Sequence, residues 1–458
     1  MVRVFNVYLP VRTVLLMGGE AIVIWTSFLV AALIHFRADS LLVLAYDNGF
    51  YKILGVTALA LILLYYFDLY DLQRLRSQGE IYFRILIVLG ALSFVLAALS
   101  FLLPNFTMGG GVFLLGLVIL TLGLIGWRSA YIWVLRQPYF RERVYILGSG
   151  DRATQLIDAL RSRPELGMEV IGWAGAIENE TLARESLGEI MINLKNRGAV
   201  DRVIVAMADR RGKMPVRELL ELKLSDVKVE EATGLTEQIS GMIDVDALNP
   251  SWLIFSDGFR MSPAFVLVRR CVSTLLAFAC LLVVSPLLPL IALGVKLSSP
   301  GPIFYKQKRV GRNGSVFYCY KFRTMTADAE AKTGPTWAID GDLRITTIGG
   351  ILRKCRFDEL PQLWNVLKGD MSFVGPRPER PEFVQTLVEA IPYYYLRHMV
   401  RPGLTGWAQI NYPYGASVED AKEKLKYDLY HIKNMSVGFD LFIVFQTIKT
   451  VLFGRGSR

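Results

Sequence analysis

Residues 264–295 read AFVLVRRCVSTLLAFACLLVVSPLLPLIALGV. From residue 271 to residue 295 the stretch is uncharged, and it is long enough to cross a bilayer. Ser285-Pro286 and Pro289 interrupt it, and proline removes a backbone donor and kinks a helix. A segment that enters the membrane and returns can absorb the freed backbone groups where protein buries them. The sequence therefore predicts an apolar helix that is broken within its own length.

Cations flank both ends of this segment. Arg269 and Arg270 lie at one end, and Lys296 and Lys306 follow the other. Because positively charged loops stay on the cytoplasmic side, the pattern indicates that both ends face the cytoplasm. We expect a re-entrant helix over residues 264–296, with a kinked fifth span as the alternative.

Four stretches upstream are long enough to span a bilayer, namely residues 14–36, 50–67, 81–103 and 111–131. The cations around them gather on one side of the membrane: Arg3, Arg12, Arg74, Arg76, Arg128, Arg136, Arg141 and Arg143. The opposite side has only Arg37. The positive-inside rule therefore predicts a four-helix transmembrane region, residues 1–140, with both ends in the cytoplasm.

Glu20 lies inside the first of these spans. An acid within a membrane span is by default a candidate for function. The alternative is that Glu20 snorkels to the surface or pairs with a neighbouring side chain.

The composition supports a membrane protein and narrows its partners. The chain has 458 residues, 53% of them hydrophobic, and a net charge of +10. Residues 258–327 contain no acid at all. Such a basic block suits nucleic acid, anionic lipid or a phosphorylated substrate, and its place beside an apolar segment favours the last two. The four cysteines form no CxxC pair, so neither a disulfide framework nor a zinc site is indicated.

A soluble α/β module is expected over residues 141–257. Strand-like runs alternate with helical stretches, at residues 143–147, 169–173, 202–207 and 227–231. This alternation predicts a small, doubly wound parallel sheet of Rossmann-like type. Gly148-x-Gly150-x-x-Ala153 matches the dinucleotide fingerprint, but alone the pattern is weak. A structural or regulatory module is favoured over a cofactor-binding one.

An adjacent acid pair, Asp358-Glu359, stands at the centre of the C-terminal half. Arg353, Lys354 and Arg356 precede it, and nearby positive charge favours the ionised carboxylate. An ionised carboxylate can attack phosphorus or bind Mg²⁺. The bland alternative is an acid pair that the helix dipole places at a helix start.

Short Pro/Gly turns and cationic runs surround this pair between residues 298 and 410. They are Pro300-Gly301-Pro302, Lys321-Phe322-Arg323-Thr324, Gly349-Gly350, Leu360-Pro361-Gln362, Gly375-Pro376-Arg377-Pro378 and Arg401-Pro402-Gly403. Several of the runs present an arginine, whose planar fork matches phosphate geometry.

In this order and spacing, the runs closely resemble the bacterial sugar transferase family of polyprenyl-phosphate hexose-1-phosphate transferases (monotopic phosphoglycosyl transferases). The resemblance covers residues 264–458, which would form an α+β catalytic domain anchored by the re-entrant helix. With the four spans and the α/β module in front, the chain looks like the long form of the family. Residues 250–258 also look like the subgroup tied to exopolysaccharide synthesis.

The resemblance implies a reaction and assigns roles to individual residues. Asp358 would attack the sugar-bearing phosphate of a UDP-sugar and expel UMP, and a polyprenyl phosphate would then displace the phosphosugar from the carboxylate. Glu359, with Asp358, would hold Mg²⁺ or assist the acceptor. Ser285-Pro286 would keep the re-entrant helix on one face. The expected phosphate and uridine contacts are Lys321, Arg323, Arg353 and Arg377, in a pocket shaped by Pro376 and Pro378.

The same resemblance implies the bacterial inner membrane, with the catalytic domain on its cytoplasmic face. Membrane lipid is then a partner and nucleic acid is not, while a homodimer would suit the long form. Where the family often has Ser-Leu before the acid pair, this chain has Arg356-Phe357, which leaves the subgroup and the sugar open.

Two other functions are alternatives to a sugar-phosphate transferase. A membrane-tethered nucleotide-sugar dehydratase or epimerase would need a Tyr-x-x-x-Lys pair, and from residue 264 onward no tyrosine has lysine four positions later. A non-enzymatic membrane scaffold would require the acid pair to be idle. Neither function accounts for the cationic turns around Asp358.

Overall fold

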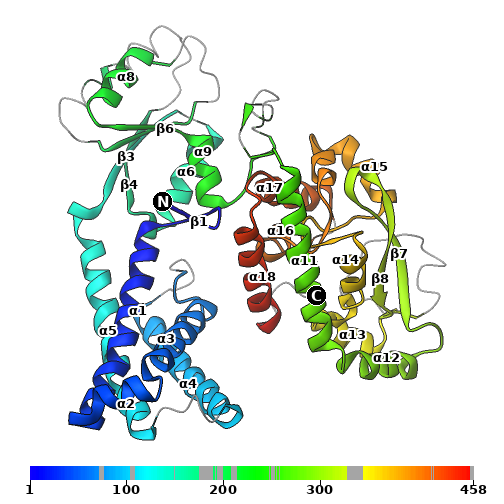
Figure 1. Ribbon diagram of the computed structural model, residues 1–458. Helices are drawn as coiled ribbons and strands as arrows, with labels where there is room; N and C mark the ends of the chain where they lie inside the picture. The colour runs from blue at the N-terminus through cyan, green and yellow to red at the C-terminus, as the bar shows by residue number, and fades with distance from the viewer. Residues whose placement is uncertain are drawn as a thin grey trace. The chain divides into compact units, whose positions relative to one another are not determined.

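The computed structural model describes the whole chain except residues 72–76, 104–108, 149, 175–188, 191, 193–199, 208–213, 247, 249–252, 254, 257, 327–343, 414, 416 and 454–458. The chain folds as two compact units. One consists of Met1–Val2 with Tyr8–Leu235, and the other of Arg3–Val7 with Thr236–Arg458 (Figure 1). Two short strands, β1 (Val2–Val4) and β2 (Val7–Leu9), begin the chain.

The first unit contains the predicted bundle of apolar helices. Its members are α1 (Val11–Phe36), α2 (Ser40–Tyr46), α3 (Gly49–Tyr66), α4 (Gln78–Leu102) and α5 (Gly110–Arg136). All four predicted spans are confirmed as helices long and apolar enough to cross a membrane. Arg74 and Arg76, used to orient the bundle, lie outside the described residues.

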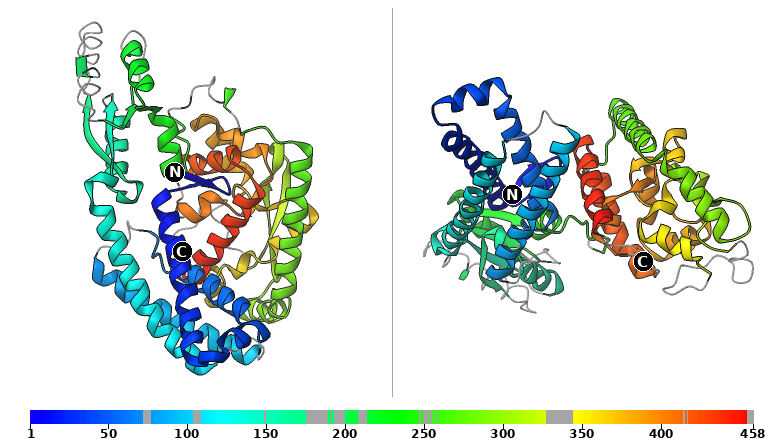
Figure 2. Two further views of the ribbon diagram at one scale, coloured as in Figure 1. Left: turned by 60° about the vertical axis from the view of Figure 1, so that its left-hand side comes forward. Right: turned by 90° about the horizontal axis from the view of Figure 1, so that it is seen from below.

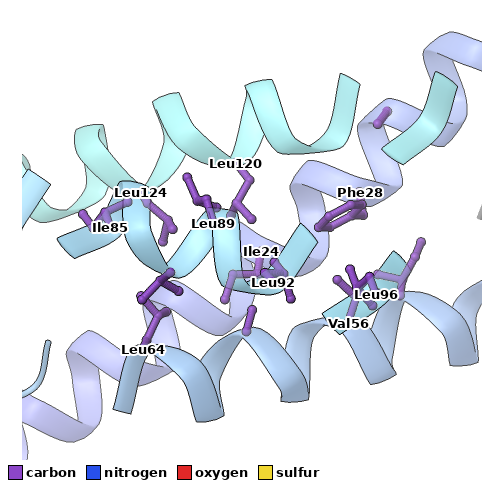
Figure 3. Close-up of a cluster of buried hydrophobic side chains, with 14 of the residues drawn as sticks. Ile24, Phe28, Val56, Leu64, Ile85, Leu89, Leu92, Leu96, Leu120 and Leu124 are labelled. Atoms are coloured by element: carbon purple, nitrogen blue, oxygen red, sulfur yellow. The ribbon is translucent and has the colours of Figure 1, made fainter. Parts of the chain in front are cut away.

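Leucine, isoleucine and phenylalanine fill the interior of this bundle. Ile24 and Phe28 of α1 pack against Leu92 of α4 and Leu120 of α5 (Figure 3). The outward faces are just as apolar, with Leu15, Ile22, Leu86 and other side chains exposed. A helix that is hydrophobic all round suits a lipid environment, because no side of it needs water.

Glu20 is fully buried and has two partners inside the bundle. Its carboxylate accepts hydrogen bonds from Arg128 Nε at 2.6 Å and from the Tyr70 hydroxyl at 2.5 Å. Arg128 also donates to the Leu69 carbonyl at 3.0 Å. The alternative in which Glu20 pairs with a neighbour is therefore correct, and the pair links α1 to α5.

The predicted parallel sheet is present beyond the bundle. Strands β3 (Glu142–Leu147), β4 (Met168–Ala174), β5 (Arg202–Val205) and β6 (Lys228–Glu231) are all parallel, in the order β4-β3-β5-β6. The helices described beside them are α6 (Asp151–Arg161), α8 (Val216–Leu224) and α9 (Ala232–Ser240). Short 3-10 turns, η3 (Pro138–Phe140) and η4 (Pro164–Leu166), join them.

Close backbone packing explains why the first residue of the dinucleotide-like motif, Gly148, is a glycine. Gly148 has a φ of +144°, and a Cβ there would come within 2.8 Å of the backbone at Ala206 and Met207. Only glycine allows the ends of β3 and β5 to approach so closely. The fingerprint therefore does not by itself require a bound cofactor.

The second unit begins with two apolar helices separated by a break. Helix α11 (Pro263–Val284) ends at Ser285 and helix α12 (Leu287–Ser298) begins after Pro286. Figures 1 and 2 show α12 turning away from the direction of α11. The predicted helix break is confirmed, and by length and composition α11 could cross a membrane.

A mixed α+β body follows. Its strands are the antiparallel hairpin β7 (Phe304–Val310) and β8 (Val316–Phe322), and the parallel pair β9 (Ser372–Val374) and β10 (Gly403–Thr405). Its helices are α13 (Thr347–Lys354), α14 (Gln362–Lys368), α15 (Pro381–Ala390), α16 (Trp407–Asn411), α17 (Val418–Lys433) and α18 (Val437–Leu452). The 3-10 turns are η5 (Arg312–Gly314), η6 (Phe357–Glu359) and η7 (Tyr394–Met399).

One core holds this body together. Val366 of α14, Leu429 of α17 and Phe439 of α18 are completely or almost completely buried in it. Helix α18 buries Phe439 and Ile443 here while Leu441 remains 46% exposed. Its inner face therefore packs as core, and only its outer face is free for a membrane surface.

Two adjacent glycines in α13 provide a matched test of this packing. A Cβ at Gly349 would collide with the backbone of Thr324, 2.8 Å from its carbonyl carbon, whereas a Cβ at Gly350 meets nothing within 4 Å. We expect Gly349→Ala to lower the free energy of unfolding by about 1–3 kcal/mol because the packed backbone at Thr324 cannot move away. Gly350→Ala should raise it by about 0.5–1 kcal/mol, since alanine favours the helix. Thermal unfolding of the detergent-solubilised protein measures both, and equal shifts would contradict this packing.

Candidate active site

The acid pair lies on a tight turn between two helices. Asp358 and Glu359 belong to the 3-10 turn η6, which follows α13 and leads through Pro361 into α14. Arg356 adopts a left-handed conformation, with a φ of +58°, and reverses the chain just before the turn. Both acids are 9% exposed. The pair is therefore not an acidic start of a regular helix placed there by its dipole.

Two cations from distant parts of the chain hold Glu359. Lys321 Nζ, from β8, lies 2.8 Å from Oε1, and Arg377 Nη2, from the turn after β9, lies 2.6 Å from the same oxygen. Burial raises the pKa of Glu359, but the charges and hydrogen bonds of Arg377 and Lys321 outweigh it and hold that pKa well below its usual value. Glu359 is therefore a fixed negative charge at any physiological pH.

Asp358 has a different environment although it is the next residue. Its side chain makes no hydrogen bond or ion pair with any residue that the structure describes. Burial raises the pKa of Asp358, and the charge of Glu359 raises it further, whereas Lys321, Arg377 and Arg353 oppose the rise. The pair thus consists of one locked carboxylate and one open, more basic carboxylate.

Arg353, which precedes the pair in sequence, favours the ionised form of Asp358 through its charge, as expected. Arg353 donates its Nε to Thr324 Oγ1 at 2.9 Å, so its influence on Asp358 is electrostatic. The cations in direct contact with the pair come from β8 and from the turn after β9 instead.

Arg323, the remaining predicted cation, fastens the end of α12. It is 5% exposed and donates to the carbonyls of Pro300 at 2.6 Å and Ser299 at 2.7 Å. The chain has just left α12 at this point, so these carbonyls have no helical partner. The structure therefore does not bring Arg323 to the acid pair, although it brings Lys321 and Arg377 there.

Pro376 and Pro378 do line a small pocket, together with Arg377 between them. Gly311, Arg397, His398 and Pro402 are among the other residues around it. His398 Nε2 is buried and has no hydrogen-bond partner in the described part of the chain. Burial, and then the charge of Arg397, lower the pKa of His398 to about 4, so its imidazole is neutral at pH 7.

Two residues near the site gave no signal in the sequence. Arg397 of η7 donates to the Arg377 carbonyl at 2.9 Å and forms an ion pair with Asp428 at 2.9 Å. Asn365 of α14 donates to the Tyr318 carbonyl at 2.8 Å and accepts from the Tyr320 amide at 3.1 Å, which ties α14 to β8. Neither belongs to a motif, and only the folded chain brings them to their partners.

The pair could hold a divalent cation only with help from a substrate. The described residues include no cluster of three or more histidine, cysteine or acidic side chains. Asp358 has open oxygens, and Glu359 Oε2 has only a 3.5 Å contact with Arg377. Mg²⁺ usually takes one or two carboxylates together with water and substrate phosphates. The donor set fits Mg²⁺ bound in that way.

Comparison with known proteins identifies the family of this chain. Residues 264–454 match the family model described as bacterial sugar transferase, and residues 65–229 match a CoA-binding domain model. The chain is 41% identical over 242 residues to UDP-N-acetylgalactosamine-undecaprenyl-phosphate N-acetylgalactosaminephosphotransferase of Aeromonas hydrophila, covering 53% of this chain and 56% of that protein. It is 33% identical to undecaprenyl-phosphate glucose phosphotransferase of Komagataeibacter xylinus, covering 72% of this chain and 63% of that protein. These two alignments thus span less than two thirds of the relatives' own length.

A third relative is matched over more of its length. The chain is 33% identical over 344 residues to UDP-glucose:undecaprenyl-phosphate glucose-1-phosphate transferase of Escherichia coli strain K12, covering 72% of this chain and 73% of that protein. The chain therefore belongs to the bacterial sugar transferase family.

The neutral His398 predicts a pH-dependent stability. Its pKa is about 4 in the folded chain and about 6.5 when unfolded, so the unfolded state binds the extra proton first as the pH falls. The contribution of neutral His398 to the free energy of unfolding is fully present above pH 6.5 and is lost progressively as the pH falls toward 4. Thermal unfolding in detergent should show a steeper fall between pH 7 and pH 4.5 for the wild type than for His398→Gln. Parallel pH profiles of the two proteins would show that His398 is not buried as described.

Proposed function

We propose that this protein transfers a sugar-1-phosphate from a UDP-sugar to undecaprenyl phosphate, releasing UMP, as the first membrane step of exopolysaccharide, O-antigen or capsule synthesis. Membership of the family supports the proposal, and so do the reactions named for the relatives. The observation that carries it is the open carboxylate of Asp358 beside the locked carboxylate of Glu359.

Asp358 acts as the nucleophile in this proposal. One carboxylate oxygen attacks the sugar-bearing phosphorus of the UDP-sugar, and the bond from that phosphorus to the bridging oxygen breaks, which releases UMP. A phosphate oxygen of undecaprenyl phosphate then attacks the same phosphorus and the bond to Asp358 breaks. Each step exchanges one phosphorus–oxygen bond for another, so Asp358 is regenerated and no net proton transfer is needed. A covalent step divides one exchange into two easier ones.

The surroundings of Asp358 suit this role. Burial raises the pKa of Asp358 and so makes its carboxylate more basic, and no hydrogen bond within the described part of the chain occupies its oxygens. Lys321 and Arg377 lie beside it and stay oriented because Glu359 binds both. Cations fixed before the substrate arrives stabilise the charge on a transferring phosphoryl group without having to reorganise. We assign phosphate contacts to these two and to Arg353, and give Arg323 a structural role.

The proposal includes Mg²⁺, held by Asp358 and by Oε2 of Glu359 together with the substrate phosphates. When bound, such an ion would neutralise diphosphate charge. The pocket of Pro376, Arg377 and Pro378 is the proposed place for the nucleotide.

We also propose that α11 and α12 enter the membrane and return to the same face. Arg270, in the N-terminal half of α11, donates to the carbonyls of Val366 and Leu367 at 2.6 and 2.8 Å, while Arg323 binds the carbonyl of Ser299 just after α12. Both ends are thus attached to one folded body. A straight helix from residue 270 to residue 299 would be about 45 Å long, and it would separate these two attachment points across a bilayer. The break at Ser285-Pro286 avoids that separation.

We further propose that the catalytic domain lies on the cytoplasmic face of the inner membrane, because cations flank both ends of the broken helix. The domain limits of 1–140, 141–257 and 264–458 remain proposals. The α/β module is assigned a structural or regulatory role, because close packing accounts for Gly148.

Replacing the nucleophile separates the enzyme from a membrane scaffold. Asp358→Asn keeps the shape of the side chain but cannot form the phosphosugar ester, so UMP release should fall by at least about 1000-fold. The assay uses detergent-solubilised protein with Mg²⁺, undecaprenyl phosphate and a panel of UDP-sugars. Glu389→Gln, an exposed acid on α15, is the control and should retain activity.

Either of two results would count against the proposal. Substantial UMP release by Asp358→Asn would remove Asp358 from the reaction. If folded wild-type protein releases no UMP with any UDP-sugar of the panel, the result would favour the non-enzymatic membrane scaffold.

The electrostatics of the pair predict a shifted pH profile. Asp358 attacks only when ionised, so the rate falls as the pH drops through its pKa. Because the charge of Lys321 lowers that pKa, Lys321→Met should move the acid limb of kcat/KM to higher pH. Lys306→Met, exposed on the outer side of the same hairpin, should leave the limb in place. An acid limb that moves equally in both variants, or in neither, would contradict the assigned contact.

A further inference from the structure

The position of Arg377 depends on a short turn, residues 374–377, between β9 and α15. Its backbone pairs with the neighbouring strand, since Gly375 donates to the Thr405 carbonyl at 2.8 Å and Gly403 donates to the Pro376 carbonyl at 2.9 Å. These bonds hold the middle of the turn. Its two end carbonyls, those of Val374 and Arg377, point elsewhere and accept from side chains.

A buried guanidinium holds the Arg377 end of the turn. Arg397 is 5% exposed and donates Nη2 to the Arg377 carbonyl at 2.9 Å. Asp428 of α17, itself 2% exposed, forms an ion pair with the same guanidinium at 2.9 Å. The Tyr394 hydroxyl accepts from Nη1. Two partners, Asp428 and Tyr394, therefore fix the guanidinium that holds the carbonyl.

A second buried guanidinium holds the Val374 end. Arg269 of α11 donates Nη2 to the Val374 carbonyl at 2.8 Å and Nε to Asp440 of α18 at 2.5 Å. His431 Nε2 lies 2.9 Å from the other oxygen of Asp440. The arrangement repeats the one at Arg397, because each arginine is fixed by a buried aspartate and directs a spare N–H at the turn.

Stability alone does not account for two such pairs around four residues. The desolvation of a buried ion pair offsets most of its attraction, and apolar residues of similar volume often stabilise a protein as well or better. A guanidinium does provide donors in a fixed fork, which apolar residues cannot. The ion pairs are therefore best explained as fixing the positions of the carbonyls that the arginines bind, and with them the position of the Arg377 side chain.

We propose that Arg269 and Arg397 are positioning residues, which fix both ends of the 374–377 turn so that Arg377 reaches Glu359. The proposal rests on the function assigned above to the Asp358–Glu359 pair. Neither arginine touches the pair; both act through the backbone of the turn. Because Arg269 belongs to α11, the apolar helix itself helps to set the geometry of the site.

A double-mutant cycle with Arg377 tests this proposal. Arg269→Lys and Arg397→Lys keep the charge but lose the fork, and each should lower kcat for UMP release by about 100-fold through misplacement of Arg377. In an Arg377→Ala background the same substitutions should cost little more, because the group that they position is gone. The matched control is Lys433→Met, which breaks a buried pair with Glu237 at 2.8 Å in the same unit. Its effect should be equal in both backgrounds.

Equal losses for Arg269→Lys or Arg397→Lys with and without Arg377 would overturn the proposal. They would mean that the arginines stabilise the fold and nothing more. If a lysine variant fails to fold, the aspartate that binds the arginine is replaced instead. Asp440→Asn weakens the hold on Arg269 and Asp428→Asn the hold on Arg397, and each is combined with Arg377→Ala in the same double-mutant cycle.

Amide hydrogen exchange provides a readout that does not require activity. Peptides covering residues 374–379 should exchange faster in Arg269→Lys and in Arg397→Lys than in the wild type, and should be unchanged in Lys433→Met. Unchanged exchange in the arginine variants would overturn the positioning role. This measurement remains decisive even if the wild type releases no UMP, a result that would contradict the proposed function instead.

Discussion

The carboxylate of Glu359 lies between the ammonium of Lys321 and the guanidinium of Arg377, with one oxygen 2.8 and 2.6 Å from them. A carboxylate in so enclosed a place is costly unless charged partners bind it, so the three groups have to meet. They come from β8, from η6 and from the turn after β9. The rest of the catalytic body can be understood as what is needed to bring these three segments together. Because both cations form their hydrogen bonds with Glu359, they affect Asp358 only through their charge.

Much of this architecture could be predicted from the sequence, because its signals are local. The long uncharged runs become α1, α3, α4 and α5, and the alternating apolar segments become the four parallel strands. The break at Ser285-Pro286 lies where the prolines indicated. Lys321 and Arg377 were expected from the sequence as substrate contacts, and their contact with Glu359 was not foreseen.

What could not be predicted depends on backbone groups that the fold exposes. Arg323 has the residue type expected of a phosphate contact, but its nearest acceptors are carbonyls left free where α12 ends. Nothing near Arg397 in the sequence indicates that a carbonyl and Asp428 will meet it in the interior. A motif identifies a residue by its neighbours along the chain, and these partners are neighbours only in space.

The buried pair of Glu20 and Arg128 has a consequence for how the protein is made. The two residues are 108 positions apart, so α1 leaves the ribosome long before its partner helix has been synthesised. An acid inside a span raises the cost of insertion, by up to about 2.5–3.5 kcal/mol at the helix centre. The remaining apolar residues of α1 have to offset that cost until α5 arrives. Until α5 has been synthesised, the Glu20 carboxyl of α1 therefore lacks Arg128, its charged partner.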